Sequence, residues 1–209
     1  MLGQDTLPAL LRAAAEEYGA HPAYVEASDG HSRVVSYAEL KRLVEATSEV
    51  YVNGGVCCAD KIVVWGPNSI DWAVAALAVS YCGAVLVPVN SRYVGAEVAD
   101  IVARTGAKLV VVHDGFLGRS QWNELLEARV HEHAEITTLA HLMTSAQGAE
   151  GLQHEDVQPD DVADILFTSG TTGRSKGAMS AHRQTIGVAR AWAELGGVCL
   201  LYTSDAADE

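Results

Sequence analysis

The chain has 209 residues, 49% hydrophobic and 20% charged, which is enough apolar material for the core of slightly more than one typical domain. Its net charge of −13, from 14 Lys and Arg against 27 Asp and Glu, argues against nucleic-acid binding by bulk electrostatics. Four cysteines suggest neither a disulfide framework nor a zinc cluster. The apolar runs are too short for a membrane span, and three acidic residues in Met1–Ala20 argue against a signal peptide, so we expect a cytoplasmic protein.

A helix and a β-hairpin are predicted at the start of the chain. Leucines and alanines recur at helical spacing between Leu7 and Ala15, and Pro8 suits the first turn of a helix. Further on, Ser28-Asp29-Gly30 separates two short segments of β-forming residues, which indicates a hairpin. The two strands are expected at 23–26 and 33–35.

A second helix and an alternating pattern of strands and helices are predicted next. Ser36 and Glu39 have the spacing of a capping box, and the helix they begin should end at Asn53-Gly54-Gly55. After it, short apolar runs alternate with helical patterns, which predicts an α/β fold with a parallel sheet covered by helices on both faces. The polar segment 145–161 is expected to be a surface connection. Strands are expected at 61–65, 84–89, 109–112 and 163–167, and helices at 70–81, 96–104 and 121–130.

The segment after the last of these strands has the composition of an anion-binding loop. Glycine lets backbone N–H groups approach phosphate oxygens, hydroxyl groups add donors, and lysine supplies a positive charge. A Walker A loop is excluded, because it needs Gly before the Lys and Ser or Thr after it, whereas Ser175 and Gly177 flank Lys176. The segment reads Thr168-Ser169-Gly170-Thr171-Thr172-Gly173-Arg174-Ser175-Lys176-Gly177.

Together with Ala178 and Met179, this loop resembles the signature loop of the adenylate-forming (AMP-binding) enzyme superfamily. That superfamily contains acyl-CoA synthetases, luciferases and the adenylation domains of peptide synthetases. It usually has proline at the position of Ser175, so we expect a difference in loop stiffness rather than in chemistry. The resemblance covers about Thr6 to Gly197, because three upstream blocks stand in the family's order: Ser36–Leu40, Gly66-Pro67-Asn68-Ser69 with Trp72, and Gly83–Asn90.

Two further strings make the chain most similar to the acyl-CoA ligase branch, specifically to ligases of steroid-degradation acids. They are Asn90-Ser91-Arg92-Tyr93 and Arg174–Arg183. The resemblance implies a carboxylic acid, ATP, Mg2+ and coenzyme A as reactants: the carboxylate attacks the α-phosphate of ATP, and the thiol of coenzyme A then displaces AMP. It also implies that the β- and γ-phosphates are held by Thr168, Ser169, Gly170, Thr171, Thr172, Gly173 and Lys176.

No residue matches the family's adenine motif, its magnesium-binding acid, its ribose-binding Asp or its C-terminal lysine. We therefore expect residues 1–198 to be the N-terminal portion of such a domain, without catalytic or metal-binding residues and inactive alone. The last residues, Cys199–Glu209, resemble translated sequencing adapter and are expected to be a non-native tail. Two alternatives stay open: an amino-acid-activating adenylation domain of a peptide synthetase, and a nucleotide-binding module without ligase activity.

Other chemically suggestive residues have simpler interpretations. The pair of imidazoles in His131-Glu132-His133 lacks a third ligand nearby, so a solvated surface is expected rather than a metal site. Cys57-Cys58 and Cys82 are expected to be small core residues, because no adjacent basic group would activate them. His182 follows the loop, where a position at a helix start and a role beside the substrate are both open.

Overall fold

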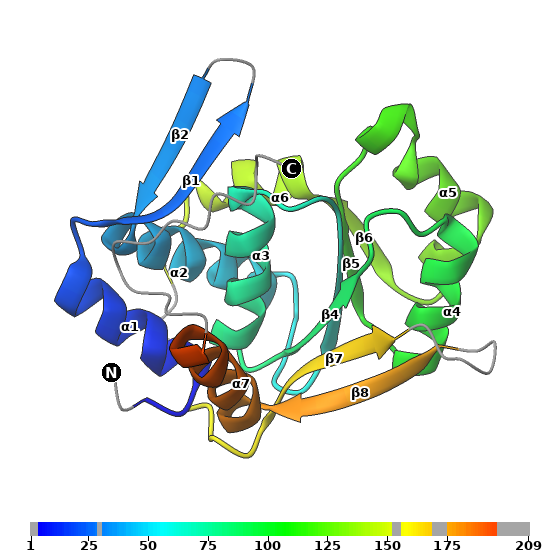
Figure 1. The fold of residues 1–209 in the computed structure, drawn as a ribbon. Helices are drawn as coiled ribbons and strands as arrows, with labels where there is room; N and C mark the ends of the chain where they lie inside the picture. The colour runs from blue at the N-terminus through cyan, green and yellow to red at the C-terminus, as the bar shows by residue number, and fades with distance from the viewer. Residues whose placement is uncertain (1–3, 29–30, 152–155, 169–174, 196–209) are drawn as a thin grey trace.

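A six-stranded sheet organises the computed structural model, which describes residues 4–28, 31–151, 156–168 and 175–195 (Figure 1). Its strands are β3 (Lys61–Trp65), β4 (Val85–Val89), β5 (Leu109–Val112), β6 (Glu135–Thr138), β7 (Val162–Thr168) and β8 (Lys176–Ala181). They lie in the order β6-β5-β3-β4-β7-β8, and all neighbours pair in parallel except β7 and β8. The expected α/β fold is confirmed. The antiparallel edge strand differs from the parallel sheet predicted, because so short a connection cannot make a parallel crossover.

The N-terminal elements follow the prediction closely. Helix α1 (Leu7–Tyr18) precedes the hairpin of β1 (Pro22–Ser28) and β2 (His31–Ser36), which stands apart from the main sheet (Figure 1). Helix α2 (Tyr37–Asn53) begins where expected, since the Ser36 hydroxyl accepts a hydrogen bond from the Glu39 backbone N–H at 3.2 Å. These local capping signals were sufficient to locate the helix start.

Two of the later helices were predicted well, and the region around 115–146 was not. Helices α3 (Ile70–Tyr81) and α4 (Gly95–Thr105) are confirmed. Helix α5 (Gln121–Glu127) stops short of the expected 130, because Arg129 takes a φ of 59° and a 3-10 turn, Val130–Glu132, follows. The short edge strand β6 and helix α6 (Leu139–Ala146) were not predicted, and α6 reaches into the segment expected to be a connection. The last described helix is α7 (His182–Leu195).

Helices cover both faces of the sheet, and the alternation of side chains along the strands divides the core into two layers. Ile62 and Val64 of β3 belong to the layer that contains α1, α2, α3 and α6. Val63 and Trp65 face the opposite layer, which contains α4 and α5. All four side chains are at most 1% exposed. Full burial of such side chains stabilises the fold by about 1.5–3 kcal/mol each, so this part of the sheet is a rigid scaffold.

The cysteines correct one expectation. Cys82 is buried at the end of α3, as predicted. Cys57 and Cys58 are exposed, and the core position expected for them was wrong. They lie in the turn between α2 and β3, where the Cys57 backbone N–H donates to the Asp60 carboxylate at 2.8 Å, so the backbone of this turn is fixed outside both core layers.

Within the described part of the chain, no helix combines the length and the apolar composition needed to cross a membrane.

Candidate functional site

The hairpin of β7 and β8 carries the two ends of the predicted phosphate loop. Thr168 is the last residue of β7 and Lys176 the first of β8, and the antiparallel register places them directly opposite each other. Residues in such a pair project from the same face of a sheet with Cβ atoms about 4.5–5.5 Å apart. Both side chains are exposed. The fold therefore places a threonine and a lysine side chain on the same face of the hairpin, at the two ends of the loop.

The middle of the loop cannot be compared with the prediction. The remaining predicted phosphate-binding residues, Ser169, Gly170, Thr171, Thr172 and Gly173, lie outside the described residues. Their role stays a prediction.

Below the mouth of the loop, the two strands are in close contact. Phe167 of β7 is paired with Gly177 of β8. A Cβ atom on Gly177 would lie 3.0 Å from Ile165 and 3.1 Å from the Phe167 ring, so the absence of a side chain lets this ring lie over the partner strand. The guanidinium carbon of Arg104, from the end of α4, lies 4.9 Å from the centroid of the same ring.

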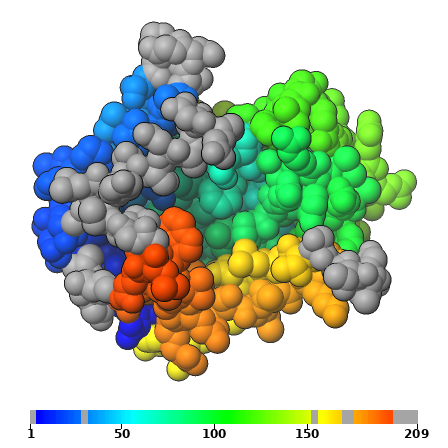
Figure 2. Space-filling view, in the orientation of Figure 1, coloured from blue at the N-terminus to red at the C-terminus, as the bar shows by residue number. Residues whose placement is uncertain are grey.

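Arg104 also reaches the other side of the hairpin. Its guanidinium donates to the Ser175 hydroxyl oxygen at 3.2 Å and to the Ser175 backbone carbonyl oxygen at 2.9 Å. It forms an ion pair with Asp100, one turn earlier on α4, at 3.1 Å. In the space-filling view the yellow and orange atoms of β7 and β8 border the green atoms of α4 (Figure 2). Sequence reasoning did not find Arg104, because 71 residues separate it from Ser175 and no local pattern links them.

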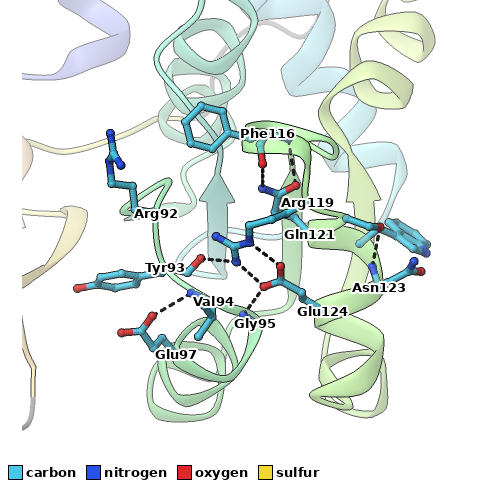
Figure 3. Close-up of polar contacts among 12 residues, drawn as sticks. Arg92, Tyr93, Val94, Gly95, Glu97, Phe116, Arg119, Gln121, Asn123 and Glu124 are labelled. Atoms are coloured by element: carbon cyan, nitrogen blue, oxygen red, sulfur yellow. Dashed lines mark hydrogen bonds and ion pairs between the residues drawn. The ribbon is translucent and has the colours of Figure 1, made fainter.

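The segment after β4, which contains Asn90-Ser91-Arg92-Tyr93, is held by a second polar network (Figure 3). Arg119 donates to the two carboxylate oxygens of Glu124 at 2.8 and 2.6 Å and to the backbone carbonyl of Tyr93 at 3.1 Å. Glu124 also accepts the backbone N–H of Gly95 at 2.9 Å. The network thus ties the start of α4 to α5, while the Arg92 side chain points away from it (Figure 3).

The carboxylate of Glu124 is kept in its charged form by this network. The hydrogen bonds from Arg119 lower the pKa of the Glu124 carboxyl, and the Gly95 N–H adds to the effect. Gly95 packs so tightly that a Cβ atom there would lie 2.5 Å from the Glu124 carbonyl oxygen. Arg119 and Glu124 were missed by sequence reasoning, since their spacing matches no regular contact pattern.

The other candidates from the sequence, His131-Glu132-His133 and His182, lie at positions that the fold explains without a ligand. His131, Glu132 and His133 are exposed in and after the 3-10 turn, and the described residues contain no group of three or more metal-ligating side chains. His182 is the first residue of α7 and is buried, which assigns it to the helix start. Its Nδ1 accepts a hydrogen bond from the Leu7 backbone N–H at 3.3 Å, and burial lowers its pKa although Asp161 and Asp164 oppose this shift.

Comparison with known proteins places this hairpin in a family context. The AMP-binding enzyme family matches residues 11–205. The chain belongs to the AMP-binding enzyme family. This agrees with the family that the loop at 168–177 and the three upstream blocks indicated. The matched range also reaches into the segment expected to be a tail, and the tail's origin stays a prediction.

Two curated relatives of this AMP-binding chain are methyl-dioxo-octahydro-indenyl-propanoyl:CoA ligases. The ligase of Rhodococcus jostii (strain RHA1) is 37% identical, over 96% of this chain and 41% of the relative. The ligase of Mycobacterium tuberculosis (strain ATCC 25618 / H37Rv) is 35% identical, over 91% of this chain and 39% of the relative. The chain therefore spans about two fifths of the length of these relatives.

Solved structures support the fold. ATP-bound MatB from Rhodopseudomonas palustris superimposes with a TM-score of 0.76 at 27% identity, covering 91% of this chain and 37% of that one. A fatty acyl CoA synthetase of Mycobacterium tuberculosis gives a TM-score of 0.79 at 23% identity, covering 91% of this chain and 37% of that one, which is evidence for the fold alone.

Proposed function

We propose that this chain forms the phosphate-binding part of an ATP-dependent acyl-CoA ligase. The observation that carries the proposal is the pairing of Thr168 with Lys176 at the two ends of a loop rich in glycine and hydroxyl groups. Such a pair offers one neutral donor and one positive charge to the same anion. The membership of the AMP-binding family makes a nucleotide phosphate the natural anion.

The reaction needs stabilisation of a leaving group. In the first step a carboxylate oxygen bonds to the α-phosphorus of ATP, the bond from that phosphorus to its bridging oxygen breaks, and pyrophosphate leaves with the bonding electrons. Thr168 and Lys176, with Ser169–Gly173, would hold the β- and γ-phosphates as this negative charge develops. In the second step the thiol of coenzyme A gives its proton to solvent and its sulfur bonds to the acyl carbon, while the bond from that carbon to the phosphate oxygen breaks and AMP leaves with the bonding electrons.

Magnesium is not assigned to protein ligands in this proposal. The described residues contain no group of three or more carboxylate, imidazole or thiol side chains that could hold a metal ion. Magnesium is proposed to arrive bound to the phosphate oxygens of ATP, because Mg2+ commonly takes several of its oxygen ligands from substrate phosphates and water.

The proposed acid is a propanoic acid carried on a fused bicyclic ring of the kind produced by steroid degradation. Support comes from the two ligases that are 37% and 35% identical to the chain and are named for such an acid. Coenzyme A is the proposed acyl acceptor on the same grounds.

The proposal can be tested in a chimera in which residues 1–198 replace the corresponding part of the Rhodococcus jostii ligase. We expect acid-dependent exchange of pyrophosphate into ATP. Lys176→Ala should lower the rate constant about 10²–10³-fold, the range observed when one preorganised donor is removed. Lys41→Ala is the matched control, because Lys41 is a surface lysine paired with Glu45 on α2.

Three outcomes would contradict the proposal. Exchange activity of the Lys176→Ala chimera within threefold of the parent would exclude the phosphate role. Absence of exchange in a chimera with a cooperative unfolding transition would exclude adenylation by this chain. Thioester formation on a carrier protein instead of coenzyme A would assign the chain to an adenylation domain.

A further inference from the structure

Arg104 lies between the packed core and the exposed loop end of the β7–β8 hairpin, and it connects the two. It lies in the last turn of α4, whose side chains Val98, Ile101 and Val102 are at most 3% exposed against the sheet. The base of the arginine is therefore fixed by packing. Its guanidinium, in contrast, lies outside the core against the two sides of the hairpin.

We propose that Arg104 is a positioning residue for the phosphate loop. It holds β7 through the Phe167 ring and the entry to β8 through Ser175, and thereby fixes the place of Lys176, which follows Ser175 directly. This inference rests on the function proposed above, since positioning Lys176 matters only if Lys176 contacts phosphate.

The chemistry of the contacts favours arginine over other residues. A guanidinium is planar and carries several N–H donors, so it can stack on an aromatic ring while two nitrogens donate to separate acceptors. The two acceptors are the hydroxyl and carbonyl oxygens of Ser175, at 3.2 and 2.9 Å. A lysine keeps the positive charge, but its single ammonium group cannot stack on the ring while two nitrogens donate to separate acceptors.

The hairpin needs such a restraint because its own packing is weak. Ala163 and Ile165 at the start of β7 are buried, but toward the loop Leu166 is 48% exposed and Met179 of β8 is 70% exposed, so burial holds the loop end of the hairpin only weakly. A shift of about 1 Å in a positioning group is enough to cost a factor of 10² in a reaction rate. A restraint at the mouth of the loop therefore acts where displacement is most damaging.

The first test measures the restraint itself in the full 209-residue chain. Arg104→Met keeps apolar contact with Phe167 and removes both donors. We expect the amides of Phe167, Thr168, Lys176 and Gly177 to exchange with deuterium about five times faster, the change that the loss of about 1 kcal/mol of local hydrogen bonding produces. Ser175→Ala removes one acceptor and should give a smaller increase.

The matched control is Arg33→Met on β2, which removes a surface arginine paired with Asp71 at 2.6 Å, away from the β7–β8 hairpin. This control variant should leave the amide exchange rates of β7 and β8 unchanged. Unchanged hairpin exchange in Arg104→Met would overturn the proposal. An equal increase in the amide exchange rates of β3 would also overturn the proposal, because it would show that the substitution destabilises the whole fold.

The second test measures binding by NMR titration of the same chain with inorganic pyrophosphate. We expect Arg104→Met to raise the dissociation constant about fivefold, with an unchanged unfolding midpoint. Arg104→Lys should leave both hairpin exchange and pyrophosphate binding impaired. If lysine restores binding while exchange stays fast, Arg104 acts through its charge and the positioning role is wrong.

The two tests separate this inference from the proposed function. If the unmodified chain does not bind pyrophosphate and Lys176→Ala changes nothing, the phosphate role of the loop fails, and the positioning role fails with it. The exchange experiment would then still show whether Arg104 restrains the hairpin. If Lys176→Ala weakens binding and Arg104→Met does not, the proposed function stands and the role of Arg104 is refuted.

Discussion

The central parallel strands and the β7–β8 hairpin belong to one sheet but are stabilised differently. Ile62 and Val63 of β3 are 0% exposed and lie under helices, whereas Met179 of β8 is 70% exposed. The central strands are held by burial along most of their length, whereas burial in the hairpin is confined to the first part of β7, and β8 is held by pairing with β7 and by a few polar contacts such as those of Arg104 with Ser175. The difference shows a packed scaffold carrying a more exposed hairpin, an arrangement typical of elements that carry functional loops.

The two regions should respond very differently when one side chain in each is truncated. Ile62→Ala should lower the free energy of unfolding by about 2–5 kcal/mol, because it leaves a cavity between β3 and the helices. Met179→Ala should change it by no more than about 0.5 kcal/mol, because the side chain is largely in solvent. Urea unfolding followed by circular dichroism measures both. Similar losses for the two variants would show that the exposed strand is as well packed as the core.

The network between α4 and α5 should have an intermediate effect. Glu124→Gln removes the charge that Arg119 and the Gly95 N–H bind, and should cost about 1–3 kcal/mol. Because the folded pKa of Glu124 is lowered, this stability is present above the ordinary pKa of about 4.3 and is lost as the pH falls through the folded value.

The control for this network is Glu127→Gln, on the same helix and exposed. Unfolding free energies measured from pH 7 to pH 3 should converge for Glu124→Gln and the unmodified chain at the acid end. A constant difference across the range would show that the carboxylate charge contributes nothing.

His182 should make a smaller contribution that depends on pH. Its Nδ1 must be unprotonated to accept the Leu7 N–H, and burial lowers its pKa. The stability is therefore fully present above the unfolded pKa of about 6.5 and falls as the pH drops toward the folded value, by on the order of 1 kcal/mol for one hydrogen bond.

His182→Asn keeps an acceptor but cannot titrate, so its unfolding free energy should lose the pH dependence between about pH 7 and pH 5. His133→Asn is the control, since His133 is exposed. Identical pH profiles for His182→Asn and the unmodified chain would refute the contribution of the imidazole.

The smallest effect is expected from the end of the chain. Deletion of Cys199–Glu209 should change the free energy of unfolding by no more than about 0.5 kcal/mol, as for a terminus outside the packed core. Thermal unfolding of the two chains makes the comparison. A larger destabilisation, or slow amide exchange within these residues, would mean that the segment is packed and native.

The central part of the fold could be predicted from local signals in the sequence. The apolar run at 61–65 predicted a strand that the structure confirms as β3, and the capping residue Ser36 located the start of α2 to the residue. These signals are local, since a cap or a buried run is encoded within a few neighbouring residues. The composition of the loop at 168–177 likewise identified the phosphate-binding candidate.

The contacts between the ends of that loop and residues distant in the sequence depend on tertiary packing. The pairing of Thr168 with Lys176 depends on strand register, and the contacts of Arg104 with Ser175 and Phe167 depend on how α4 packs beside the hairpin. The network of Arg119 and Glu124 likewise reaches the segment after β4 only because α4 and α5 are neighbours. Such contacts join residues far apart in the sequence, so no periodicity or local composition records them, and they appear only when the sheet and its helices have assembled.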